Sequence, residues 1–186
     1  MADANPLLPI RVLHDFVERL EKLGIAHMLT GSLAMFQYST YRMTADIDIV
    51  IEIDSATGER LANSISMDYY VPIDSMRGAI RSKRMFNLLH QETAFKVDCV
   101  MRKDTAFHSN AFKRRQVVDF HGKEISIITA ADLILSKLWW ASDSHFEKQL
   151  GDVRNLIRNQ LDFDYIEKWS RELGVIDLLE RCKSEI

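Results

Sequence analysis

The sequence predicts a mixed α/β fold of the α+β class, in which a mixed sheet flanked by helices precedes a helical C-terminal segment. Two observations predict it. Short runs between residues 25 and 128 alternate apolar and polar residues, which is typical of strands. After residue 128 the apolar spacing becomes helical and stays so. We therefore divide the 186 residues into a core, 1–128, and a helical segment, 129–186, packed on it as a single compact unit.

Each element follows from local patterns. The expected strands are, in chain order, 25–30, 47–53, 69–73, 85–90, 94–101, 116–120 and 124–128. The expected helices are 10–23, 33–38, 55–67, 74–83, 129–140, 146–157, 165–173 and 175–182. Ser32 and Asp74 are predicted N-caps, Thr129 and Asp132 form a capping box, and Gly24 is a helix stop.

The composition is that of an ordinary globular protein, with 47% hydrophobic and 27% charged residues. A net charge of -3 gives no overall nucleic-acid signature. Cys99 and Cys182 lie far apart without metal-ligand spacing, and Cys99 is expected to be a buried thiol. No signal peptide pattern and no apolar run of about 20 residues is present. We therefore expect a cytoplasmic protein without a membrane partner.

Asp46 and Asp48 are the most informative residues. In the run 42–53 carboxylates alternate with β-branched residues, so both aspartates are expected on one face of a strand. Two like charges on one face repel each other, and a divalent cation between them would relieve this repulsion. Carboxylate oxygens suit Mg²⁺. The alternative is a solvent-facing pair on an edge strand.

Two further features could belong to the same site. Thr30-Gly31-Ser32 follows a strand and opens a helix, where free backbone N–H groups could bind a phosphate; the alternative is a plain helix cap. Asp98 interrupts the apolar run 94–101, which is costly unless the charge is ion-paired with Lys or Arg or bound to a metal. Beside the first strand, Asp98 would complete three carboxylates around two metal ions.

The ordered set of Gly31-Ser32, Asp46-x-Asp48 and Asp98 resembles the nucleotidyltransferase superfamily built on the DNA polymerase β palm. It is most similar to the branch related to abortive-infection toxins of type IV toxin–antitoxin pairs. That further resemblance rests on Arg42-Met-Thr44, the segment 131–138 with Lys137, Asp152-Val153 and the segment 173–180. The segment 145–148 departs from these toxins, which often carry an arginine there.

The resemblance implies a palm-like sheet and an enzyme that moves NMP from an NTP to an RNA, protein or small-molecule acceptor, with release of pyrophosphate. The implied catalytic residues and ligands of Mg²⁺ or Mn²⁺ are Asp46, Asp48 and Asp98. The implied nucleotide-binding residues are Gly31, Ser32, Arg42, Thr44 and Lys137. Arg42 and Thr44 would shape the loop before the catalytic strand. The implied partners are an NTP such as ATP, a tRNA or protein acceptor, and a cognate antitoxin.

A competing hypothesis is a non-catalytic nucleotide- or RNA-binding regulatory module on the same fold, against which the three carboxylates argue. Lys137 could instead snorkel from an apolar helix face. Trp139 and Trp140 are interpreted as packing residues rather than a base-stacking platform. The clusters 81–84 and 113–115 could bind RNA phosphates or be solvated charge. His108 and His145 are expected to be exposed.

Overall fold

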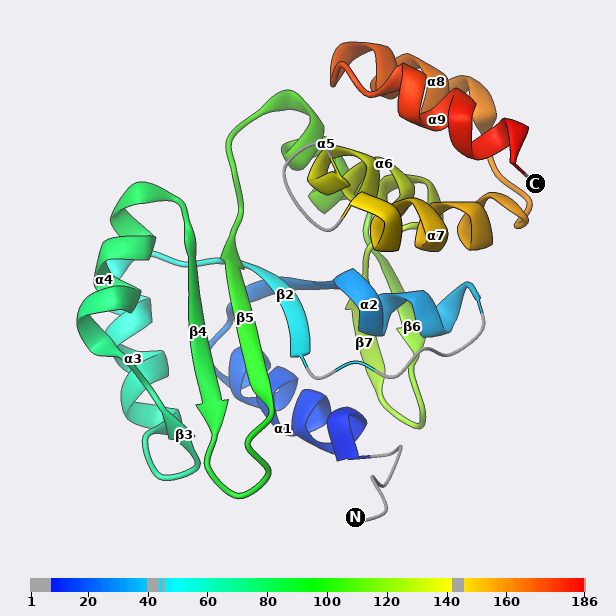
Figure 1. The fold of residues 1–186 in the computed structure, drawn as a ribbon. Coiled ribbons are helices and arrows are strands. Elements are labelled where there is room, and N and C mark those ends of the chain that lie inside the picture. Colours follow the sequence, from blue (N-terminus) through cyan, green and yellow to red (C-terminus); the bar gives the residue numbers. More distant parts are fainter. Residues whose placement is uncertain (1–7, 40–43, 45, 142–145, 186) are drawn as a thin grey trace.

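The computed structural model describes residues 8–39, 44, 46–141 and 146–185. Its centre is a seven-stranded mixed sheet with the order β3-β4-β5-β2-β1-β7-β6 (Figure 1). The strands are β1 Ala26–Thr30, β2 Asp46–Glu52, β3 Tyr69–Tyr70, β4 Met85–His90, β5 Lys96–Met101, β6 Gln116–Asp119 and β7 Glu124–Ile127. β2 is central, antiparallel to β1 and parallel to β5. The predicted mixed fold is therefore confirmed, and the edge-strand alternative for Asp46 and Asp48 is wrong.

Helices cover the sheet and continue beyond its last strand. They are α1 Leu8–Lys22, α2 Gly31–Ala34, α3 Ser55–Ile65, α4 Ile73–Ser82, α5 Ala106–Arg114, α6 Ala130–Ala141, α7 Phe146–Ile157, α8 Phe163–Glu172 and α9 Ile176–Ser184, with a short 3₁₀ turn at Met35–Gln37. α1 packs against β1, β2 and α3. α6 to α9 pack on one another above the sheet in Figure 1. None of the helices within the described ranges is long and apolar enough to span a membrane.

Three local predictions were wrong. α5 was not predicted, because the polar residues His108, Ser109 and Asn110 separate its buried residues and hide the helical period. Ser32 is not an N-cap, since Thr30 holds that position and Ser32 lies within the first turn. Asp74 likewise lies inside the first turn of α4, after the cap residue Pro72.

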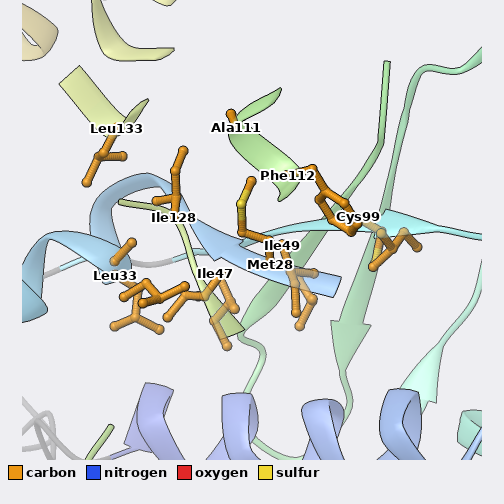
Figure 2. Packing of buried hydrophobic residues seen from close by; sticks show 14 of the residues in the cluster. Met28, Leu33, Ile47, Ile49, Cys99, Ala111, Phe112, Ile128 and Leu133 are labelled. Atoms are coloured by element: carbon orange, nitrogen blue, oxygen red, sulfur yellow. The ribbon is translucent and has the colours of Figure 1, made fainter. Parts of the chain in front are cut away.

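Alternation along β2 separates the core from the site. Ile47, Ile49 and Ile51 are fully buried, whereas Asp46 and Asp48 lie on the opposite face. Figure 2 shows Ile47 and Ile49 packed in the hydrophobic cluster below the central strands. Burying one such side chain contributes about 1.5–3 kcal/mol, so these isoleucines fix which face of β2 carries the carboxylates.

Candidate active site

The strand register brings the predicted carboxylates together on one face. Asp48 of β2 lies directly opposite Asp98 of β5, and Asp46 lies opposite Lys96. Thr30 of β1 and Asn87 of β4 extend the same line on either side. We call the line Thr30, Asp48, Asp98 and Asn87 the carboxylate row.

A second line of side chains lies two residues away on the same face. The pairings Met28 with Val50, Val50 with Val100, and Val100 with Met85 align it across the four strands. We call Met28, Val50, Val100 and Met85 the apolar row. Residues two apart on a strand are separated by about 6.6 Å, so polar and apolar zones adjoin closely.

Gly31 brings backbone against the Asp48 carboxylate. Its φ of 65° lies in the left-handed region that favours glycine. A Cβ atom at this position would overlap the Asp48 side chain. Gly31 therefore allows an approach between α2 and β2 that no other residue would allow.

The Gly31→Ala substitution is expected to destabilise the protein more than Gly24→Ala. Both glycines have a positive φ, 65° and 68°, but an added Cβ at Gly24 would meet nothing within 4 Å. Gly24→Ala should therefore cost only the left-handed strain of about 1–2 kcal/mol, while Gly31→Ala adds a collision with Asp48. Urea unfolding of both variants measures the difference; equal losses would show that Asp48 moves away without cost.

The carboxylates repel one another strongly at Asp48. Burial, followed by the charges of Asp46 and Asp98, raises the pKa of Asp48 to about 6, and the charges of Lys137 and Lys96 oppose this shift. Lys96 Nζ lies 2.9 Å from Asp98 Oδ2 and 3.9 Å from Asp46 Oδ2. Asp98 is thus ion-paired, as the alternative interpretation allowed, and it also accepts a hydrogen bond from Asn87 Nδ2.

Thr44, two residues before β2, is tied to the first aspartate. The buried Thr44 donates a hydrogen bond from Oγ1 to Asp46 Oδ1 at 2.7 Å. The predicted residue Arg42 lies outside the described residues. Thr44 therefore orients a carboxylate.

Within the described ranges, no three His, Cys, Asp or Glu side chains form a ready-made metal cluster. The ammonium of Lys96 lies between Asp46 and Asp98, and Asp46 has a side chain that is 41% exposed. Mg²⁺ is commonly held by one or two carboxylates together with substrate phosphates. The oxygen donors of Asp46 and Asp48 fit that pattern, which does not require a complete protein cage.

Lys137 of α6 lies near Asp48, and its ammonium is bound by side chains of α7. It is only 4% exposed, so the snorkelling alternative is wrong. Its Nζ donates to Asp152 Oδ2 at 2.7 Å and to Gln149 Oε1 at 3.4 Å. Asp152 was not predicted as a site residue; the signal in the sequence was a carboxylate between Leu150 and Val153, which are buried in α7.

A cavity of about 220 Å³ joins these groups. It is lined by Gly31, Ser32, Asp48, Asp98 and Lys137. α5 and α6 contribute an aromatic wall, which we define as Phe107, His108, Trp139 and Trp140. Because the carboxylate row and the apolar row lie two residues apart along the strands, the sheet side of the cavity has a polar half and an apolar half.

The exposure of His108, a residue of the aromatic wall, was misjudged from the sequence. His108 is partly buried rather than exposed, and burial, followed by the nearby charge of Lys103, lowers its pKa to about 4. Trp140 is 43% exposed. His145 lies outside the described residues. Because α5 was not predicted, nothing in the sequence placed His108 beside Trp139, where their ring centroids are 5.5 Å apart.

The cluster 113–115 is partly structural. Arg114 Nε donates to the fully buried Asp132 at 3.2 Å, and its guanidinium lies 4.1 Å from the Tyr165 ring centroid. Arg115 lies over the ring of Phe112. Arg114 thereby links α5 to α6 and α8, while its side chain stays 40% exposed.

No protein-family model matches the sequence, and no curated protein matches it. Solved structures do match. ANT(2'')-Ia, solved in complex with adenylyl-2''-tobramycin, superposes with a TM-score of 0.60 at 12% identity over 89% of this chain and 97% of the other.

Two further structures have the same arrangement. An antigenic nucleotidyltransferase-like protein from Paracoccidioides brasiliensis gives a TM-score of 0.53 at 14% identity, over 79% of this chain and 74% of the other. The lincomycin-bound lincosamide antibiotic adenylyltransferase LnuA gives 0.51 at 16% identity, over 80% and 96%. The chain has a nucleotidyltransferase-like fold. At these identities the likeness concerns the fold, and the toxin branch does not follow from it.

Proposed function

We propose that this protein transfers NMP from an NTP to an acceptor hydroxyl, with release of pyrophosphate, in a metal-dependent reaction. The observation that carries the proposal is the position of Asp48. It is flanked by Asp46 and Asp98, it lies against the backbone of Gly31, and its pKa is raised to about 6. Perturbed carboxylates in a cavity are typical of functional sites, and the fold is the one that nucleotidyltransferases use.

Mg²⁺ or Mn²⁺ fits these residues, with Asp46 and Asp48 as the main ligands and Asp98 as the third. When bound, the ion supplies positive charge to the phosphates and the attacking oxygen. The repulsion that raises the pKa of Asp48 is the physical reason to expect a cation here. The ammonium of Lys96 already supplies one positive charge at the Asp98 end.

The remaining residues would position the substrate. The backbone at Gly31 and the hydroxyl of Ser32 would donate to the β- and γ-phosphates. Lys137 would add positive charge, since it already acts on Asp48 electrostatically. Asp98 would accept the proton of the acceptor hydroxyl as it attacks. In-line transfer places the acceptor and the leaving pyrophosphate on opposite sides of the α-phosphorus, as the Asp98 and Gly31 ends of the site allow.

The acceptor class is a separate prediction. A tRNA end, a protein hydroxyl and a small molecule each fit the reaction, and a cognate antitoxin stays a prediction of the resemblance. The antibiotics named for ANT(2'')-Ia and LnuA are ligands of those proteins.

The Asp48→Asn variant tests the site by thermal unfolding. Burial and repulsion disfavour ionised Asp48 in the folded state, so its contribution to the free energy of unfolding falls as pH rises from about 4 to about 6. At pH 8 without metal, Asp48→Asn should therefore raise the free energy of unfolding by about 1–3 kcal/mol. The melting temperature should rise by several degrees. At pH 4 the gain should vanish.

Mg²⁺ with an NTP should reverse this order. Ligands that prefer the folded state raise the melting temperature, so the wild type should gain several degrees and Asp48→Asn little. Glu172→Gln, which removes an exposed carboxylate on α8, is the control and should follow the wild type in both conditions. Equal ligand-induced shifts in all three proteins would place nucleotide binding elsewhere.

A further inference from the structure

We propose that the nucleoside of the NTP binds in the apolar half of the cavity, over the apolar row and against the aromatic wall, with Trp140 as a base-stacking residue. This inference rests on the proposed function, because it takes the carboxylate row as the place of the α-phosphate. It assigns to Trp139 and Trp140 a ligand-binding role in addition to packing.

Geometry separates the places of the three substrate parts. Pyrophosphate leaves at the Gly31 end of the carboxylate row, and the acceptor approaches at the Asp98 end, because the two must be in line. The nucleoside must therefore extend from the α-phosphorus roughly perpendicular to the carboxylate row. On one side of the row, Asp46 and Lys96 carry charge and are partly exposed. On the other side lies the apolar row, about 6.6 Å away, which leaves room for a ribose between phosphate and base.

The apolar half is lined by side chains that suit a planar aromatic ring. The apolar row forms its floor, and the aromatic wall closes it from α5 and α6. Trp139 and Trp140 lie with ring centroids 5.8 Å apart and an interplanar angle of 83°, so they present faces in two directions. Stacking on such faces tolerates every base, since each base has a π-face.

The size of the cavity suits part of an NTP rather than the whole molecule. At about 220 Å³ it is smaller than the roughly 300–1,000 Å³ typical of sites that enclose a whole small molecule. A base with its ribose would occupy the apolar half, while the triphosphate lies along the carboxylate row. Asp46, which does not line the cavity, lies on that more open side.

Charge argues against a cationic acceptor in the same place. Lys103 Nζ lies 4.2 Å from the centroid of the Trp139 ring, and Arg102 also lines the cavity. His108, with a pKa near 4, is neutral at pH 7. The charge of Arg102 is paired with Glu52 and Asp104, so a polyamine would meet the ammonium of Lys103 here. A neutral base with carbonyl oxygens or ring nitrogens could accept a hydrogen bond from that ammonium.

Intrinsic fluorescence offers a direct test, because the chain has three tryptophans and the third, Trp169, does not line the cavity. In a Trp169→Phe background, quenching should be titrated with Mg²⁺-NTP and with Mg²⁺-tripolyphosphate, which has the phosphates but no base. We expect the NTP to quench and to bind at least about tenfold more tightly than tripolyphosphate. Trp140→Leu should lose that tenfold advantage and keep its affinity for tripolyphosphate.

The outcomes separate this inference from the proposed function. Equal affinities for NTP and tripolyphosphate, or an unchanged NTP affinity in Trp140→Leu, would overturn the stacking role. If tripolyphosphate binding is nevertheless lost in Asp48→Asn, the proposed phosphate and metal site stands without the stacking role of Trp140. If the wild type binds neither ligand, both fall. Because Trp140 is 43% exposed, Trp140→Leu is expected to fold, and its melting temperature checks this.

Discussion

Replacing Lys137 with methionine is expected to lower the free energy of unfolding by about 3–5 kcal/mol, because it leaves the charge of Asp152 buried without its ammonium partner. Both side chains are nearly inaccessible, at 5% and 6% exposure, and their charged atoms are 2.7 Å apart. For a chain of this length the loss corresponds to about 10 °C in melting temperature. Urea unfolding at pH 7.5 measures it.

The double variant Lys137→Met with Asp152→Leu provides the matched comparison. Replacing both charges of a buried pair with apolar residues is often neutral, so most of the lost stability should return. Lys22→Met removes an exposed pair with Glu18 and should cost less than about 1 kcal/mol. A loss that small for Lys137→Met would show that the charge of Asp152 is compensated without Lys137.

The double variant also separates packing from catalysis. If Lys137 only supports the contact between α6 and α7, the stable double variant should keep the wild-type affinity for Mg²⁺-NTP. If Lys137 reaches the phosphates, as proposed, the variant should fold and bind the nucleotide more weakly. Fluorescence titration at 25 °C distinguishes the two results.

Alternation along single strands made much of the site predictable. The pattern of β2 placed Asp46 and Asp48 on one face, and the apolar residues around Asp98 marked it as a costly charge that needed a partner. Both inferences use only the period of two and the cost of burying charge. The Gly31-Ser32 turn was likewise local, although its cap residue was misassigned.

Contacts between residues far apart in the chain could not be predicted from the sequence. Nothing local indicated that Asp48 would lie opposite Asp98, fifty residues later, or that Lys96 would lie between Asp98 and Asp46. The Lys137–Asp152 contact depends on how α6 packs on α7. Propensity and periodicity describe one element at a time, whereas these contacts are decided by which elements pack together.

The most direct test of the central claim is transfer of label from each of the four NTPs, labelled at the α-phosphate, to RNA, protein or small-molecule extracts with Mg²⁺ or Mn²⁺. Catalysis of this kind rests on metal binding and positioning, so loss of one metal ligand should lower the rate by several orders of magnitude. The wild type and Glu172→Gln should label a discrete acceptor, and Asp46→Ala should not. Because the Asp46 side chain is partly exposed, Asp46→Ala is expected to keep the fold. Labelling that survives in Asp46→Ala, or a wild type that labels nothing with any NTP, would contradict the account.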